Sequence, residues 1–180
     1  MSITSGVLVG NPRPASRTLG AALALRDAVQ RVVGGIETGP VVDAAELAQQ
    51  VFAPGATEVK AALTALTATN VLVVASPTYK ATYTGLLKAV LDQAPGGALT
   101  GIVALPLMVA AADKHALAVD LHLRPVLVEL GATVPGPGVF VNEARLTGDH
   151  ELLTGELAAE LESTGVATTL RALLALTAKV

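Results

Sequence analysis

Short apolar runs with the character of β-strands alternate along this chain with longer segments whose apolar residues have helical spacing. The run NVLVVAS, residues 70–76, is almost continuously apolar, which is typical of a strand buried on both faces of a parallel sheet. Parallel neighbours need long crossover connections, and the helical segments supply them. The alternation therefore predicts a doubly wound α/β protein with three layers, in which helices cover both faces of a mostly parallel five-stranded sheet. The expected strands are residues 3–9, the end of 35–43, 70–76, 101–109 and 136–142, and the expected helices are residues 18–33, 58–68, 84–93, 114–130 and a long one from about residue 149.

The chain is rich in hydrophobic residues, yet these are not gathered into a membrane-spanning run. Mean hydropathy is +0.59, and 52% of the 180 residues are hydrophobic. The longest apolar run, residues 101–112, contains Pro106 and is shorter than the roughly 18–20 apolar residues that a span requires. No repeat, low-complexity linker or charge run marks a domain boundary. We therefore expect a soluble protein with a single domain over residues 1–180.

Charge and cysteine content exclude several classes of function. A formal net charge of −3 offers no electrostatic footprint for nucleic acid, which favours a basic face. The absence of cysteine removes disulfides, thiolate metal sites and thiol catalysis. The start, MSITSG, lacks the basic region of a secretory signal, so a cytoplasmic location is expected. Small molecules are the favoured partners, with neither nucleic acid nor a membrane expected.

The stretch GNPRPASRT, residues 10–18, concentrates polar side chains between the first strand and the first helix. Ligands of open α/β sheets gather at such loops, where unpaired N–H groups and the helix dipole favour an anion. Donors suited to a phosphate come from Asn11, Arg13, Ser16, Arg17 and Thr18. The loop lacks the glycine and lysine positions of a dinucleotide fingerprint or a P-loop. The alternative is ordinary capping of the helix by Ser16 with both arginines solvated, and this loop alone does not decide between the two.

Both tyrosines of the chain fall in one loop, SPTYKATYT, which follows the third expected strand. In the strand order 2-1-3-4-5 the first and third strands are neighbours, so this loop would face the phosphate loop across one crevice. Pro77 restricts the exit from the strand, and a flat aromatic ligand can lie against the following backbone and Tyr79. Alternatively, Tyr79 and Tyr83 only cover the end of the sheet. Two facing loops, one suited to a phosphate and one to a ring, favour the ligand-binding interpretation.

These motifs resemble those of the flavodoxin-like NAD(P)H-dependent FMN reductases, and most closely the reductase components that feed reduced FMN to two-component alkanesulfonate monooxygenases. The loop 10–18 is similar to their phosphate loop, G-S-x-R-x-x-S-x-[ST], with Asn11 in place of the usual serine. Residues 76–92 are similar to their ring-binding loop and the helix after it. Residues 105–132 and 138–144 are similar to their fourth and fifth strand regions. The resemblance covers roughly residues 3–145.

The resemblance implies a flavodoxin-like sheet in the order 2-1-3-4-5, an FMN site, and hydride transfer from NADH or NADPH to flavin N5. The flavin carries this chemistry, so no side chain is expected to be catalytic. The implied partners are FMN, a nicotinamide nucleotide, a flavin-dependent monooxygenase, and further copies of this chain in a homodimer or homotetramer. The implied contacts are Asn11, Arg13, Ser16, Arg17 and Thr18 for the phosphate, Pro77, Thr78, Tyr79 and Lys80 for the ring, and Ala110 and Ala111 for its pyrimidine edge.

Besides Asn11, the chain departs from the family pattern in two regions. Ala110 and Ala111 stand where the family usually has a glycine pair beside the flavin, and each adds a methyl group and restricts φ. Leu121 stands where sulfonate-linked reductases often carry an inserted tyrosine at a tetramer contact. The apolar segment 114–130 that contains it offers a dimer or tetramer face.

Three alternatives to an FMN reductase remain open. A quinone or azo-compound reductase would use the same flavin site with a different second substrate. A flavodoxin-type electron carrier is disfavoured, because the sequence has neither a strongly acidic docking face nor aromatic residues for both sides of the ring. A flavin-free binding or scaffold protein on this fold is the alternative that the alanine pair supports. No metal is expected, because His115 and His122 lie two helical turns apart, too far for joint ligation.

Overall fold

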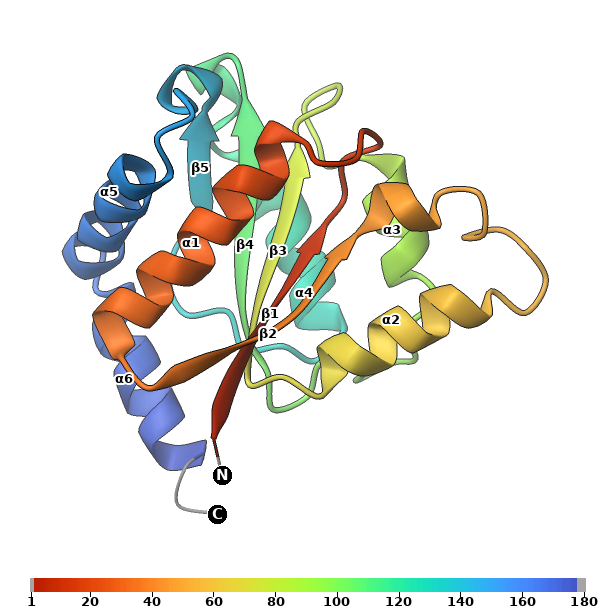
Figure 1. Ribbon diagram of the computed structural model, residues 1–180, viewed down its shortest axis with the longest axis horizontal. Helices are drawn as coiled ribbons and strands as arrows, with labels where there is room; N and C mark the ends of the chain where they lie inside the picture. The colour runs from red at the N-terminus through yellow and green to blue at the C-terminus, as the bar shows by residue number, and fades with distance from the viewer. Residues whose placement is uncertain (1, 178–180) are drawn as a thin grey trace.

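The computed structural model describes residues 2–177, and its central element is a parallel five-stranded sheet. The strand order is β2-β1-β3-β4-β5, as the sequence predicts. All four neighbouring pairs are parallel, so the carboxyl ends of the strands share one edge, at the top of Figure 1. The strands are β1 (Ile3–Val9), β2 (Ile36–Asp43), β3 (Val71–Pro77), β4 (Val103–Ala110) and β5 (Val139–Asn142).

Helices cover both faces of the sheet and complete the three layers. One face carries α1, α5 and α6, and the other carries α2, α3 and α4 (Figure 1). None of the helices within residues 2–177 is long and apolar enough to cross a bilayer. The helices are α1 (Arg17–Val33), α2 (Thr57–Thr67), α3 (Gly85–Leu91), α4 (Arg124–Glu129), α5 (His150–Ser163) and α6 (Val166–Thr177).

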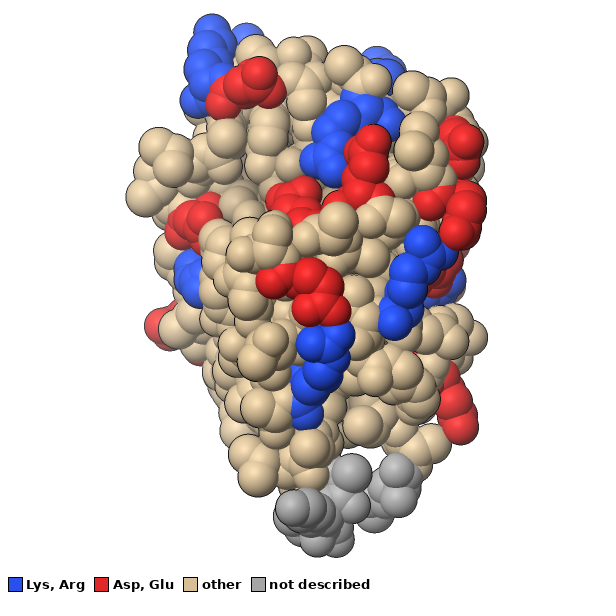
Figure 2. Space-filling model, turned by 90° about the vertical axis from the view of Figure 1, so that its left-hand side faces the viewer, with Lys and Arg blue, Asp and Glu red and all other residues tan. Residues whose placement is uncertain are grey.

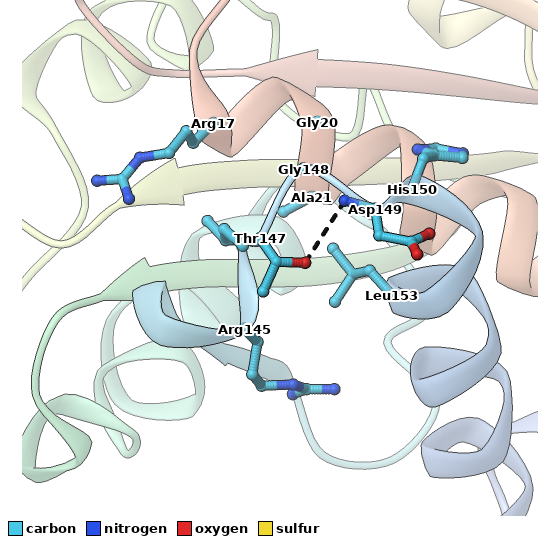
Figure 3. A pocket seen from close by; sticks show the side chains of 10 residues that line it. Arg17, Gly20, Ala21, Arg145, Thr147, Gly148, Asp149, His150 and Leu153 are labelled. Atoms are coloured by element: carbon cyan, nitrogen blue, oxygen red, sulfur yellow. Dashed lines mark hydrogen bonds between the residues drawn. The ribbon is translucent and has the colours of Figure 1, made fainter.

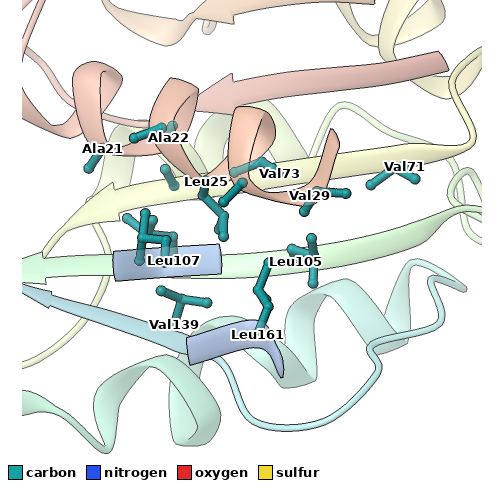
Figure 4. Packing of buried hydrophobic residues seen from close by; sticks show 14 of the residues in the cluster. Ala21, Ala22, Leu25, Val29, Val71, Val73, Leu105, Leu107, Val139 and Leu161 are labelled. Atoms are coloured by element: carbon teal, nitrogen blue, oxygen red, sulfur yellow. The ribbon is translucent and has the colours of Figure 1, made fainter. Parts of the chain in front are cut away.

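Each central strand supplies residues to two hydrophobic cores, one on either face of the sheet. The α1 core lies beneath α1, α5 and α6, and the α2–α4 core lies beneath α2, α3 and α4. Successive side chains of a strand point to opposite faces, so Val7 of β1 packs in the α1 core whereas Leu8 packs in the α2–α4 core. In the α1 core, Leu25 and Val29 lie against strand residues such as Val73 (Figure 4). Full burial of β3 and β4 explains why these strands have continuous apolar sequences rather than alternating ones.

An arginine–glutamate ion pair and a histidine–aspartate contact join α1 and α5 at the surface. Arg31 pairs with Glu151 at 2.5 Å, and the His150 ring lies 2.8 Å from an Asp27 oxygen. Figure 2 shows cationic and acidic side chains interspersed over this side of the molecule instead of gathered into one patch. Exposed pairs of this kind stabilise a fold by about 1 kcal/mol or less each, so burial of apolar side chains holds the helices in place.

The segment 114–130 is not the continuous helix that the sequence predicts. It contains a 3₁₀ turn at Asp113–His115 and a π-helical turn at Val119–Leu123 before α4 begins. The physical reason is Pro125, which has no N–H to donate to Leu121 and whose ring crowds that carbonyl. The wider π turn relieves the conflict, and the Arg124 N–H reaches back to the Val119 carbonyl.

Three other predicted boundaries are wrong. The long C-terminal helix is two helices, because Gly165 takes φ +75°, a left-handed conformation that ends α5. The second strand is longer than predicted, since its pairing with β1 runs from Ile36 to Asp43 and an edge strand tolerates Pro40. The fifth strand is shorter, because the Arg124 guanidinium binds the Gly136 carbonyl and keeps that stretch a loop.

Candidate functional site

The loops after β1 and β3 lie against each other at the carboxyl edge of the sheet. The Gly10 N–H donates to the Ala75 carbonyl at 2.8 Å, and the Thr84 hydroxyl donates to the Gly10 carbonyl. Thr84 also caps α3, because its hydroxyl accepts from the Leu87 N–H at 3.1 Å. A Cβ on Gly10 would lie 2.2 Å from Leu87 Cβ, so only glycine permits this approach. The structure thus brings the predicted phosphate loop and ring loop together.

Hydrogen bonds made by its own polar side chains stabilise the phosphate loop. Buried Asn11 donates to the Thr18 hydroxyl at 3.1 Å and accepts from the Arg13 N–H at 3.0 Å. Ser16 is the N-cap of α1, and its hydroxyl accepts from the Leu19 N–H at 3.2 Å. The backbone N–H groups of Arg17 and Thr18 make no hydrogen bond within residues 2–177. Capping by Ser16 and a free pair of anion-binding donors therefore coexist in this loop.

The two arginines of the loop have different surroundings. Arg13 is exposed, and its guanidinium has no ion-pair partner among the described residues. The Arg17 guanidinium lies 2.8 Å from a Glu143 oxygen at the end of β5, with 64% of the side chain exposed. Within residues 2–177, Arg13 is thus the cation of this loop that has no carboxylate partner, whereas Arg17 pairs with Glu143.

Sequence reasoning missed Asp43, a buried carboxylate beside the phosphate loop. Asp43 is the last residue of β2, and its two oxygens accept from the Ala15 N–H at 3.0 Å and the Ala45 N–H at 3.2 Å. Ala15 has φ +49°, so this bond holds the loop in a conformation that alanine rarely adopts. The available signal was an acidic residue at the carboxyl end of a strand next to β1, because parallel strands end at the same edge.

The ring loop contains a tight turn at Lys80 and Ala81. The backbone groups of Tyr79 and Thr82 bind each other in both directions, at 2.8 and 3.2 Å. Both central residues have positive φ, +52° and +67°, as a type I′ turn requires. Tyr79 is 44% exposed beside this turn, whereas Tyr83 is half-buried against the α2–α4 core. The two tyrosines therefore differ: Tyr79 is accessible to a ligand, and Tyr83 covers the core.

The base of the ring loop adjoins the end of β4. The Thr78 N–H donates to the Val109 carbonyl at 2.7 Å, which places the loop beside Ala110 and Ala111. Ala110 is buried and Ala111 exposed, and neither has a positive φ. The Thr78 hydroxyl is buried without any hydrogen-bond partner among residues 2–177. A buried hydroxyl left unpaired is unfavourable by about 1–3 kcal/mol, so this one is suited to a ligand.

An open parallel sheet in this order, with an anion-suited loop after β1 and an accessible aromatic loop after β3, defines a flavodoxin-like protein. No group of three or more potential metal ligands occurs within the described residues. The chain belongs to the NADPH-dependent FMN reductase family, whose family model matches residues 3–145.

Individual relatives agree with this assignment. The chain is 30% identical to the NADH-dependent FMN reductase SfnF of Pseudomonas putida over 149 residues, 80% of each chain. It is 46% identical to an FMN reductase (NADPH) of Escherichia coli K12 over 79 residues, which are 44% of this chain and 41% of that protein. The matched segments span about half the length of the first curated relatives, between 41% and 55%.

A solved structure shows the same arrangement in three dimensions. The apo form of an NADH:FMN oxidoreductase superposes with a TM-score of 0.70 and 26% sequence identity. The superposition covers 88% of this chain and 89% of that one. The similarity therefore extends over most of the two folds.

Proposed function

We propose that this chain is an NAD(P)H-dependent FMN reductase that uses FMN bound across the loops after β1 and β3. The observation that carries the proposal is the presence of hydrogen-bonding groups without partners at the ends of two adjacent strands, within the described residues. Among residues 2–177 the Arg17 and Thr18 N–H groups have no acceptor, and the buried Thr78 hydroxyl has no hydrogen-bond partner. The phosphate and ring of FMN would meet them, and the family assignment supports that choice.

The residues of the two loops would bind and orient the flavin. The phosphate would accept from the α1 N–H groups and from Arg13, while Asn11 and Asp43 hold the loop in shape. Pro77, Thr78, Tyr79 and Lys80 would line the ring. FMN, when bound, supplies the hydride-accepting centre, so the chain needs no catalytic acid, base or nucleophile.

The alanine pair is compatible with this site in its backbone conformation. Neither Ala110 nor Ala111 has a positive φ, so the backbone conformation at these positions does not require glycine. The two methyl groups would then act only by their volume at the pyrimidine edge of the ring.

The test is a titration of the protein with FMN followed by flavin fluorescence, then assays of NADH and NADPH oxidation with and without FMN. We expect saturable binding and FMN-dependent oxidation. Replacing Thr78 with valine is expected to weaken FMN binding by about tenfold, the effect of one hydrogen bond lost from a buried site. Absence of both binding and turnover in the unaltered protein would reject the reductase and support a flavin-free role.

We also propose that copies of this chain associate through an exposed apolar stripe. Leu117, Leu121 and Val128 are 69%, 65% and 54% exposed; the first two lie in the turns before α4 and the third lies within α4. A dimer or tetramer that joined these stripes would remove them from water. In sedimentation experiments, Leu121→Glu should lower the oligomeric state, whereas Leu152→Glu on α5 should not. An unaltered protein that sediments as a monomer would reject this proposal.

A flavin-dependent monooxygenase as the acceptor of reduced FMN is proposed from the family resemblance. A test is coupled turnover, in which such an oxygenase consumes its substrate only when this chain, FMN and a reduced nicotinamide nucleotide are all present. The cytoplasmic location stays a prediction.

A further inference from the structure

A cavity of about 290 Å³ lies between the start of α1 and the loop that leads into α5. Figure 3 shows its walls, with Gly20 and Ala21 on one side and Thr147 and Leu153 on the other. Its size is close to the lower limit for small-molecule sites. Of the residues proposed to contact FMN, Arg17 alone lines it, and the ring loop does not. The cavity therefore adjoins the proposed flavin site at Arg17, and its other lining residues have no role in that site.

Two arginines line this cavity, and their known ion pairs do not use all of their N–H donors. Arg17 binds Glu143 through one terminal nitrogen, and Arg145 binds Glu156 and Glu160 at 3.0 and 3.5 Å. A guanidinium carries five N–H donors, so these bonds leave several free. Both side chains reach solvent, with 64% and 30% of their surface exposed. A planar fork of this kind suits a phosphate that has two or three free oxygens.

The acidic side chain at the cavity is already engaged. Asp149 is the N-cap of α5, and its carboxylate accepts from the Leu152 N–H at 2.9 Å. His150 is turned toward Asp27 at 2.8 Å, and in Figure 3 it lies at the opposite side of the view from Arg17. Arg17 and Arg145 are the cationic side chains that line the cavity, and a phosphate there would share them with the carboxylates of Glu143, Glu156 and Glu160.

Gly20 keeps the cavity open at its α1 wall. A glycine inside a helix is less favourable than alanine by about 1 kcal/mol. A Cβ at Gly20 would meet nothing within 4 Å, so packing within the protein does not require glycine there. The open space instead leaves an apolar wall of small residues, against which a flat ring can lie.

We propose that this cavity binds the 2′-phosphoadenosine end of NADPH, with Arg145 as a residue that determines preference for NADPH over NADH. The inference rests on the proposed function, because it assigns the second half of the hydride donor. The cavity and the flavin site share the first turn of α1, so a dinucleotide can bridge them along the carboxyl edge. Its apolar walls suit adenine, and its arginines suit the dianionic 2′-phosphate that NADH lacks.

The direct test uses adenosine 2′,5′-bisphosphate as a probe, measured by calorimetry on the full chain without FMN. We expect saturable binding, weaker by about tenfold or more in Arg145→Ala and in Gly20→Leu, since one loses charge-assisted bonds and the other fills the cavity. The control is Arg31→Ala, which breaks an exposed arginine–glutamate ion pair to α5 outside the cavity, and this variant should bind as the unaltered protein does. Adenosine 5′-monophosphate should bind more weakly and be unaffected by Arg145→Ala.

Failure of the inference and failure of the proposed function give different results. FMN-dependent turnover without binding of the bisphosphate, or with binding unchanged in both cavity variants, would overturn the inference alone. Bisphosphate binding with the expected variant pattern, but no FMN binding, would overturn the reductase alone. In steady-state assays Arg145→Ala should raise KM for NADPH and leave kcat and the KM for NADH unchanged. A change in thermal stability alone would not produce that split.

Discussion

At the scale of single residues, the turn at Lys80 and Ala81 places two side chains in a conformation that glycine favours. Ala81 has φ +67°, where a Cβ is unfavourable by about 1 kcal/mol. Replacing Ala81 with glycine should therefore raise the free energy of unfolding by up to about 1 kcal/mol, measured by urea denaturation. The matched control is Ala65→Gly on exposed α2, where the same change should lower stability by about 1 kcal/mol. Equal losses at both positions would contradict the account of the turn.

Gly10 is the residue on which the approach of the two loops depends. Gly10→Ala should destabilise the protein by about 1–3 kcal/mol, because its Cβ would overlap Leu87. Gly96→Ala, where a Cβ meets nothing within 4 Å, should stay within about 1 kcal/mol of the unaltered protein.

A double-mutant cycle separates this overlap from other effects. Leu87→Gly alone leaves a cavity and weakens α3, yet it removes the Leu87 Cβ that a Cβ on residue 10 would meet at 2.2 Å, so its loss should not add to that of Gly10→Ala. Strict additivity would show that the overlap is not the cause.

At the scale of elements, Thr84 ties α3 to the end of β1. Its hydroxyl serves both the Leu87 N–H and the Gly10 carbonyl, so Thr84→Val removes a helix cap and leaves a buried carbonyl unpaired. We expect a loss of about 2–3 kcal/mol in chemical denaturation. Thr84→Ser keeps the hydroxyl and should therefore retain most of the stability that Thr84→Val loses. A serine variant as unstable as the valine variant would show that the methyl group matters more than the bonds.

At the scale of the whole molecule, the two cores are linked through shared strands. Val7 and Val9 of β1 face one core and Leu8 the other, so neither core can come apart while the sheet stays intact. We propose that residues 1–180 form a single domain and expect one cooperative transition in urea. Circular dichroism and the fluorescence of Tyr79 and Tyr83, the only tyrosines, should report the same midpoint. Two separate midpoints would indicate independently folding parts.

Local patterns by themselves predicted the order of the strands and crossover helices and the positions of the loops after β1 and β3, but not every boundary. Apolar runs such as 70–76 specify a buried strand, and a polar loop before α1 specifies where donors gather, because both signals lie within a few residues. The family resemblance rests on the same loops, and its site residues stay predictions.

The tertiary structure decided what depends on contacts distant in sequence. Arg17 lies beside Glu143, 126 positions away, and Asp43 reaches Ala15 across 28, so neither contact has a local signal. The cavity at Gly20 likewise forms only where α1 meets the loop before α5. The break at Pro125 is different, since proline is visible in the sequence, but the π turn that accommodates it depends on how that helix packs. The sequence determined which segments form and where the loops lie, and packing decided which side chains face one another, because spacing along a chain constrains local geometry and not distant neighbours.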